Sequence, residues 1–274
     1  MKLMIVGTHP SNTNGYSKVI YNIVNCLSDD YEIFWYGIQK SSNVSCRSLK
    51  SNTIVYDVYQ DEQCHNLNEN GFYYSGLQRY VSIVQPDILL IYNDPVVCGN
   101  YLLKLEKNIH VFLYLDLVYL PSKSIVDNII TPVVENVNGV FVIDEHWKQF
   151  INHKNVNTIP HGLNIHTTNN HTSLLLNDTF YFLNLNRNTL RKRLDITVRA
   201  FAKLVLELPN IKVCLIVKEF NDYQPWNLYE IFSNETDKNP NDYIKTLRND
   251  LTDEQIEQLY ASCHVGINTC EGEG

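Results

Sequence analysis

The sequence predicts an α/β protein made of two parallel-sheet domains in tandem. Short runs rich in Ile, Val, Leu and aromatic residues recur along the chain, and a stretch of helical periodicity separates each run from the next. This alternation is typical of parallel sheets, because each parallel connection needs a crossover that covers the sheet. A polar stretch at 166–177 (HTTNNHTSLLLN) interrupts the pattern and predicts a linker between domains of 1–165 and 178–274.

The first domain is expected to hold most of the strands. Each proposed strand is short and mostly apolar, as in a sheet buried on both faces, and each proposed helix carries apolar residues at i, i+3 and i+4. We expect strands at 2–7, 32–36, 53–58, 87–92, 110–115, 139–143 and 157–159, and helices at 17–27, 74–84, 96–106, 124–134 and 145–152.

The second domain is expected to be shorter, with an insertion that carries a short helix at 223–241. Three strands make a poor open sheet, and the sequence ends directly after the third. We therefore expect either a fragment of a longer protein or missing strands that come from elsewhere, for example from an oligomer. The strands are expected at 180–185, 212–217 and 265–268, and the helices at 194–208 and 253–262.

The composition narrows the classes of partner. The 22 Lys and Arg against 30 Asp and Glu give a net charge of −8, which argues against a surface built for nucleic acid or anionic lipid. The seven cysteines form no C-x-x-C pair, and no apolar run is long enough for a signal peptide core or a transmembrane segment, so a cytoplasmic protein with reduced thiols is expected. The sequence contains no D-x-D triplet, a motif whose carboxylates can hold a divalent metal ion. Neither a metal nor another cofactor is therefore expected.

A cation-rich turn is the most informative local feature. Arg187, Arg191, Lys192 and Arg193 lie between a proposed strand and the helix that follows it. The dipole at a helix N-terminus already favours negative charge, so this turn is expected to hold an anion. A phosphate or diphosphate would satisfy both the cations and the free N–H groups of the helix. The alternative is a solvated basic turn.

The run NRNTLRKR, the helix DITVRAFAKL and the closing LYASCHVGINTCEGEG together resemble the donor domain of the retaining, GT-B-fold glycosyltransferase family four. The resemblance implies two Rossmann-like domains whose parallel sheets face a cleft, with the second domain incomplete. It also implies that Arg187 and Lys192 grip the diphosphate of a nucleotide sugar, in place of a metal ion.

The closing EGEG resembles the start of the family's E-x7-E element. Glu273 falls on the first Glu, which contacts the transferred sugar in that family, and Glu271 is a further donor-binding candidate. The second Glu, which binds the ribose, would lie beyond residue 274, so the activity of this chain is in question. The alternative for Glu271 and Glu273 is an ordinary polar loop with permissive glycines.

Four other residues are candidates for the same site. Gly15 follows the first strand, where a missing Cβ would let the backbone approach the donor phosphate, or it is a simple helix-entry glycine. Asp116 follows the strand at 110–115, where ligands gather in open α/β sheets, and either positions sugar hydroxyls or caps the next turn. His161 lies in IPHGLN, which resembles the family's I-P-H-G-V-D segment, and has a donor-side role or a hinge or packing role. Lys218 ends the strand at 212–217 and either contacts the nucleotide or is a surface lysine.

Together these features predict a metal-independent glycosyltransferase that moves a sugar from a UDP-, GDP- or ADP-linked donor to a glycan, protein or lipid acceptor. The resemblance to family four implies that the transfer proceeds with retention. Two alternatives stay open. One is a non-catalytic subunit that binds a nucleotide sugar or a glycan, and the other is a GT-B-fold sugar-nucleotide epimerase, which needs no acceptor.

Overall fold

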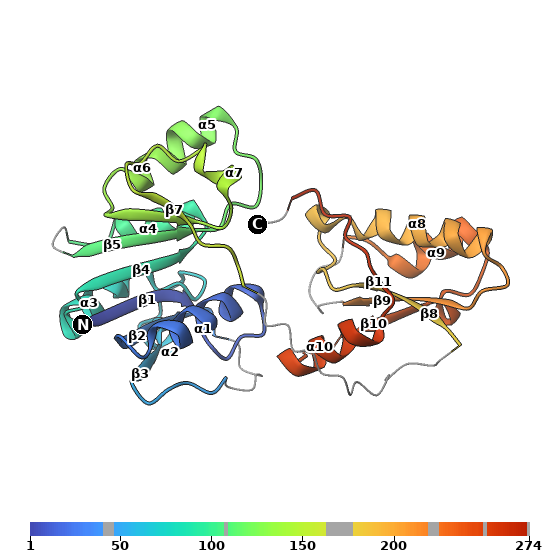
Figure 1. Ribbon diagram of the computed structural model, residues 1–274, viewed down its shortest axis with the longest axis horizontal. Helices are drawn as coiled ribbons and strands as arrows, with labels where there is room; N and C mark the ends of the chain where they lie inside the picture. The colour runs from blue at the N-terminus through green and yellow to red at the C-terminus, as the bar shows by residue number, and fades with distance from the viewer. Residues whose placement is uncertain (41–46, 107–108, 163–177, 219–224, 249–250, 273–274) are drawn as a thin grey trace. The chain divides into compact units, whose positions relative to one another are not determined.

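The computed structural model describes residues 1–40, 47–106, 109–162, 178–218, 225–248 and 251–272. Its contacts divide the chain into two compact units, Met1–Asn164 and Ile165–Glu273, each with a parallel sheet of its own (Figure 1). The prediction of an α/β protein with two parallel sheets is therefore confirmed. The expected linker at 166–177 lies outside the described residues.

The first unit contains a seven-stranded sheet in the order β3-β2-β1-β4-β5-β6-β7. Every strand pairs with its neighbours in parallel, and all seven strands fall on the segments that the apolar runs predict. The strands are β1 (Lys2–Thr8), β2 (Glu32–Ile38), β3 (Thr53–Asp57), β4 (Ile88–Asn93), β5 (His110–Leu115), β6 (Gly139–Val142) and β7 (Val156–Thr158).

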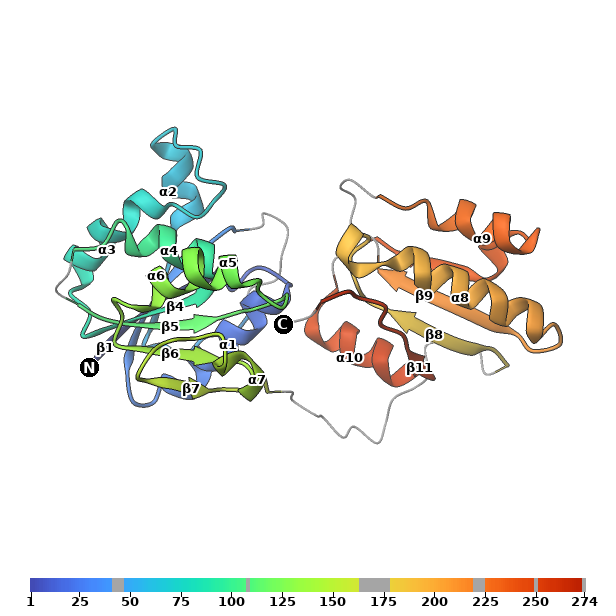
Figure 2. The same ribbon diagram turned by 90° about the horizontal axis from the view of Figure 1, so that it is seen from above.

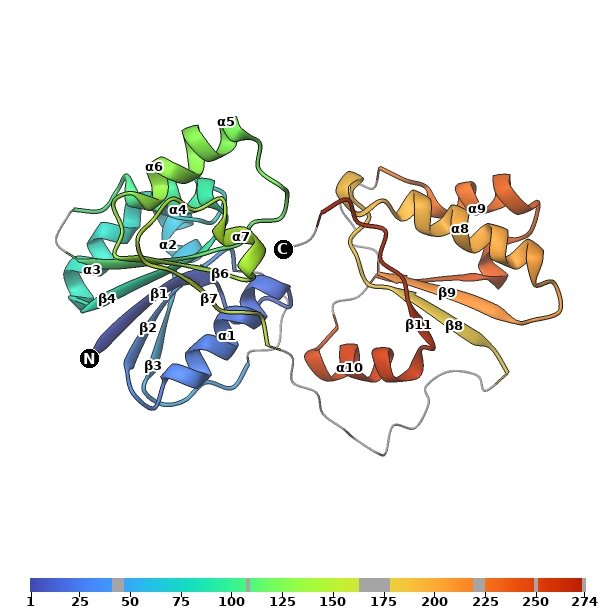
Figure 3. The same cartoon turned by 45° about the horizontal axis from the view of Figure 1, so that its top comes forward.

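The sheet of the first unit is buried on both faces, which explains why its strands are almost continuously apolar. In β1, Met4 and Val6 belong to one core cluster, whereas Leu3 and Ile5 belong to a second cluster on the opposite face. Figures 2 and 3 show α1 (Gly15–Leu27) on one side of this sheet and α3, α4 and α6 on the other.

Short polar side chains begin several of these helices, as their sequence positions favour. Asn14 caps α1 and Asp94 caps α4. One helix, α2, was not expected: Asp57 ends β3 and caps α2 directly, so Val58, the last residue of the expected strand at 53–58, begins a helix. The helix expected at 124–134 runs without interruption over residues 123–134, and its middle section is π-helical. The remaining helices are α2 (Val58–Cys64), η1 (Tyr74–Gly76), α3 (Leu77–Val84), α4 (Pro95–Leu102), α5 (Lys123–Ile125), η2 (Val126–Ile130), α6 (Thr131–Val134) and α7 (Glu145–Lys148).

The second unit contains a four-stranded parallel sheet in the order β10-β9-β8-β11. Figure 3 shows α8 and α9 on one face of this sheet and α10 on the other. Within the described residues, no helix is both long and apolar enough to cross a bilayer. The elements are β8 (Phe180–Asn184), η3 (Leu190–Lys192), α8 (Leu194–Glu207), β9 (Val213–Lys218), α9 (Leu228–Thr236), η4 (Pro240–Asp242), β10 (Ile244–Leu247), α10 (Asp253–Ser262) and β11 (Val265–Gly266).

The structure corrects the expectation of a three-stranded second sheet. β10 is a fourth strand and pairs with β9, and α9 is the crossover between them rather than part of an insertion. Phe232 of α9 packs against Phe201 of α8 with ring centroids 6.1 Å apart, inside the main core of this unit. The short run that forms β10 gave no clear signal, because a run of four residues carries little periodicity.

Each unit has a switch point in its strand order. In the first unit, the chain leaves β1 for β2 and β3 and then returns to β4 on the other side of β1. In the second unit, β8 lies between β9 and β11 in the same way. Connections diverge at such points, so the carboxyl ends of the strands there are the places where open α/β sheets bind ligands.

Candidate functional site

The loop that follows β1 is held firmly against the end of β2. The His9 N–H donates to the Ile38 carbonyl at 2.8 Å, and the Asn12 side chain donates to the Gln39 carbonyl at 2.6 Å. The Arg47 guanidinium donates to the Asn12 carbonyl at 2.9 Å. These bonds fix the backbone of the loop against the end of β2.

Gly15 begins α1 at the end of this loop. The Asn14 side chain accepts from the Ser17 N–H at 2.9 Å and caps the helix, and Gly15 itself is exposed. A Cβ built on Gly15 meets no atom within 4 Å among the surroundings that the structure describes. Packing within the described fold therefore does not require glycine at this position, and both interpretations of Gly15 stay open.

Asp116 lies at the carboxyl end of β5 and is buried, with 7% of its surface exposed. Its N–H donates to the Asn93 carbonyl at 3.1 Å, which ties it to the end of β4. Burial raises the pKa of Tyr16 far above its usual value, and the Asp116 carboxylate raises it further through its charge and a hydrogen bond. Asp116 therefore faces the first turn of α1, across the switch point of the sheet.

His161 lies at the same edge of the sheet. Its ring packs edge-on against Tyr92 and Tyr114, with centroids 6.0 and 5.7 Å away, and its Nε2 lies 3.3 Å from the Tyr92 hydroxyl. Desolvation lowers the pKa of His161, and the charge of Asp116 partly opposes this effect. The structure thus brings two predicted residues, Asp116 and His161, to one cluster of tyrosines.

The tyrosines of this cluster were not predicted as site residues. The ring centroids of Tyr16 and Tyr92 lie 5.3 Å apart, and those of Tyr92 and Tyr114 lie 4.9 Å apart. Tyr92 and Tyr114 are core residues of apolar strands, where the sequence pattern indicates only packing. Their position beside Asp116 became visible only from the pairing of β4 with β5.

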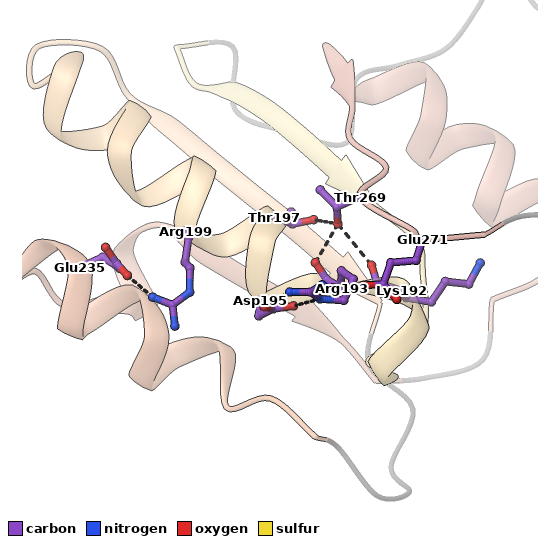
Figure 4. Close-up of polar contacts among 8 residues, drawn as sticks. All are labelled: Lys192, Arg193, Asp195, Thr197, Arg199, Glu235, Thr269 and Glu271. Carbon is purple, nitrogen blue, oxygen red and sulfur yellow. Dashed lines mark hydrogen bonds and ion pairs between the residues drawn. The ribbon is translucent and has the colours of Figure 1, made fainter.

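In the second unit, the cation-rich turn follows β8 and ends at the start of α8 (Figure 4). Arg193 forms a two-point bond with Asp195, with its Nε and Nη2 each 3.0 Å from a carboxylate oxygen. A second pair joins its Nη1 to Glu271 Oε1 at 2.6 Å. The anion expected among these cations is therefore supplied in part by the protein's own carboxylates, and Arg193 is not a free phosphate ligand.

Arg191 also bonds to the loop at 267–272 that follows β11, which we call the closing loop. Its guanidinium donates to the Gly272 carbonyl and lies 3.4 Å from the Cys270 sulfur, and its own carbonyl accepts from the Glu271 N–H at 3.0 Å. Two of the four cations thus attach this closing loop to the turn. The sequence pattern could not show this, because the two segments lie about eighty residues apart.

A buried chain of hydrogen bonds joins the same loop to the sheet (Figure 4). The Asn184 side chain donates to Thr197 Oγ1 at 2.9 Å, and Thr197 Oγ1 lies 2.7 Å from Thr269 Oγ1. Thr269 Oγ1 in turn donates to the carbonyls of Lys192 and Arg193 at 3.2 and 2.8 Å. The end of β8, the first turn of α8 and the closing loop therefore form one fixed unit.

The remaining predicted residues of the second unit lie around this turn. Arg187 is exposed and Lys192 is half-buried, and Figure 4 shows the Lys192 side chain directed away from Arg193 and Asp195. Lys218 ends β9 and is only 6% exposed, so its interpretation as a surface lysine is wrong. Glu271 is exposed at the closing loop, whereas Glu273 lies outside the described residues.

No protein-family model matches the sequence, and no curated protein matches it. Solved structures do match, among them an E. coli trehalose-6-phosphate synthase bound to UDP-2-fluoro glucose, with a TM-score of 0.65 and 12% identity over 100% of this chain and 79% of that chain. TarM matches with a TM-score of 0.69 and 12% identity over 100% and 81% of the two chains. Sucrose-phosphate synthase from Thermosynechococcus elongatus matches with a TM-score of 0.68 and 13% identity over 97% and 74%.

These neighbours are GT-B glycosyltransferases, and they match nearly the whole of this chain. The class that the fold defines is therefore the GT-B fold, with two parallel α/β units. At 12 to 13% identity the similarity establishes the fold and not the reaction, because one fold hosts many functions.

Proposed function

We propose that this chain is a nucleotide-sugar-dependent glycosyltransferase of the retaining type found in family four. The cation-rich turn at the switch point of the second sheet is the observation that carries the proposal. Fold-level support comes from structural neighbours that include a protein bound to UDP-2-fluoro glucose. The turn itself supplies the chemistry, since a diphosphate needs positive charge and backbone donors at a helix N-terminus.

Arg187 and Lys192 are the proposed ligands of the donor diphosphate. Among the described residues, the Asp195 and Glu271 carboxylates pair with Arg193 at this turn. The pairing assigns Arg193 to the protein's own framework. We assign the diphosphate to the exposed Arg187 and to Lys192, the two positions that match the donor-binding Arg and Lys of family four.

The difficult step of sugar transfer is departure of the nucleoside diphosphate. Negative charge develops on the leaving phosphate, and fixed cations at the N-terminus of α8 would stabilise it without reorganisation. Removing one such group typically costs about 3 kcal/mol of barrier, or roughly a hundredfold in rate. No metal ion enters this scheme, because the two side chains supply the positive charge.

We assign the acceptor side of the reaction to the first unit. Asp116 is a buried carboxylate beside Tyr16, and His161 stands against Tyr92 and Tyr114 at the same sheet edge. Carboxylates and imidazoles in such a setting orient sugar hydroxyls through hydrogen bonds. Gly15, at the start of α1, is the proposed point where backbone approaches the donor, and Lys218 is the proposed nucleotide contact in the second unit.

A thermal-shift screen tests the proposal first. UDP, GDP, ADP and their common sugar conjugates are each added to the protein, and a ligand at about 100 times its Kd should add about 2.7 kcal/mol of stability. Transfer of a labelled sugar to an acceptor library then follows with the nucleotide that shifts most. If no nucleotide raises the melting temperature, the proposal is contradicted.

The same experiments separate the two alternatives. Binding of a sugar nucleotide without hydrolysis or transfer would favour the non-catalytic subunit. Conversion of the donor sugar in the absence of any acceptor would favour the epimerase. Transfer that depends on an acceptor, with the anomeric configuration of the donor retained in the product, would support the proposed reaction.

A further inference from the structure

Arg193 has a backbone conformation that arginine rarely adopts. Its φ angle is +48°, in the left-handed region that favours glycine, and it stands directly before α8. A residue with a Cβ persists in this region only where its surroundings compensate for the strain. The backbone alone would favour glycine at this position, so the contacts of the side chain are what favour arginine.

The Arg193 side chain joins two carboxylates from different parts of the chain. Asp195 lies in the first turn of α8 and has only 10% of its side chain exposed, whereas Glu271 comes from the closing loop and has 55% exposed. The two-point bond to Asp195 fixes the plane of the guanidinium. The third donor, Nη1, is thereby aimed at Glu271.

The backbone of the closing loop has its own anchors. Thr269 donates to two carbonyls of the turn, and the Glu271 N–H donates to the Arg191 carbonyl. These bonds do not involve the Arg193 side chain. Loss of that side chain is therefore expected to release the Glu271 carboxylate while the loop backbone stays in place.

We propose that Arg193 is a positioning residue that holds the Glu271 carboxylate beside the cation-rich turn, and that it promotes sugar transfer through Glu271 rather than by binding the donor diphosphate. This role rests on the proposed function. It separates the turn into two parts, with Arg187 and Lys192 for the diphosphate and Arg193 for the orientation of a carboxylate. A carboxylate displaced by about 1 Å can cost a reaction on the order of a hundredfold in rate.

Four variants of the full chain test this role. Arg193→Gly removes the side chain and relieves the backbone strain, but it also leaves the nearly buried Asp195 carboxylate without its partner. The two effects on stability oppose each other, so kinetics are measured well below the melting temperature of the variant. We expect kcat to fall by about tenfold to a hundredfold, while the KM for the donor and the Kd for the nucleoside diphosphate stay within about twofold. Glu271→Gln should lower kcat to a similar degree, and the double variant should be no worse than either single variant. Arg193→Lys retains a cation for Glu271 but loses the two-point bond, so it should recover part of the rate.

Arg199→Met is the matched control. Arg199 lies on the same helix and pairs with Glu235 of α9, away from the closing loop (Figure 4). This variant removes an Arg–Glu ion pair that does not involve the closing loop, and it should leave kcat and nucleotide affinity within about twofold.

Three results would overturn the inference. Unchanged kcat in Arg193→Gly would remove any role in transfer. A loss of diphosphate affinity as large as the loss of kcat would make Arg193 a donor ligand. Multiplying effects of Arg193→Gly and Glu271→Gln would show that the two residues act independently. If the wild-type chain neither binds nucleotide nor transfers sugar, the proposed function fails first, and this role fails with it.

Discussion

Replacement of Thr197 by valine tests how the closing loop is joined to the sheet of the second unit. Thr197 is fully buried, and its Oγ1 accepts from the Asn184 side chain at 2.9 Å. The hydroxyl of Thr269 donates to carbonyls of the turn, so in the 2.7 Å contact between the two threonines Thr197 is the donor. Valine has nearly the same shape, so the substitution removes these bonds without opening a cavity.

The magnitude follows from what is left without a partner. Asn184 is 1% exposed, and its amide would lose the Thr197 acceptor inside the protein. A buried polar group left without its hydrogen bond costs about 1–3 kcal/mol. For a unit of roughly 100 residues, each kcal/mol lowers the melting temperature by about 4–8 °C. The second unit should therefore unfold several degrees earlier in Thr197→Val, as followed by calorimetry or by amide hydrogen exchange.

A double-mutant cycle with Thr269→Val shows whether the bonds form one chain. We expect an interaction energy of about 0.5–1.5 kcal/mol between the two positions, because either substitution breaks the shared bond. Arg187→Ala, at an exposed position, is the control and should change stability by no more than about 0.5 kcal/mol. Strictly additive effects of the two threonine substitutions, or full stability of Thr197→Val, would refute the proposed connection.

Three further predictions concern the first unit. Glu62→Ala should destabilise this unit by about 2–4 kcal/mol in urea denaturation. The buried Glu62 carboxylate accepts hydrogen bonds from three backbone N–H groups of the loop before η1, and these groups would lose their acceptor. Full stability of the variant would show that water replaces the carboxylate. Gly37→Ala should shift the loop after β1, since a Cβ at this position would lie 2.6 Å from the His9 ring and 3.1 Å from the Tyr56 carbonyl oxygen. Unchanged NMR amide resonances of that loop would contradict the close approach. Burial lowers the pKa of His9, which is only 7% exposed, so protonation favours the unfolded chain. The stability that His9 contributes above about pH 6.5 should therefore fall as the pH drops below that value, by up to roughly 1.4 kcal/mol per pH unit. Equal melting temperatures at pH 7.5 and 5.5 would contradict this linkage.

The layout of the strands could be predicted from the sequence because parallel strands buried on both faces are apolar over their whole length. β1 shows why: its even and odd residues enter two different core clusters, so the run needs no polar alternation. The same criterion failed for β10, whose four residues IKTL are too few to show a pattern. It also failed at Val58, which the expected strand at 53–58 includes, because Asp57 ends the strand and caps a helix that begins at Val58.

Site residues could be predicted only where one segment carries the signal. The cation-rich turn is contiguous, so its charge is visible in the sequence. Its partners are not contiguous, and the pairing of Arg193 with Glu271 depends on the placement of β11 beside β8. The tyrosine cluster around Asp116 has the same origin, since its members come from α1, β4 and β5. Long-range pairing decides which of several similar side chains meet, and local periodicity contains no information about it.

Titration calorimetry of the nucleoside diphosphate tests the central claim most directly. The diphosphate with the largest thermal shift is titrated into the wild-type chain, Arg187→Ala, Lys192→Ala and Arg199→Ala. Each of the first two substitutions should weaken binding by about tenfold or more, since a hydrogen bond to a charged group contributes about 1.5–3 kcal/mol, while Arg199→Ala should bind like the wild type. Wild-type affinity in both Arg187→Ala and Lys192→Ala would show that the turn does not hold the diphosphate.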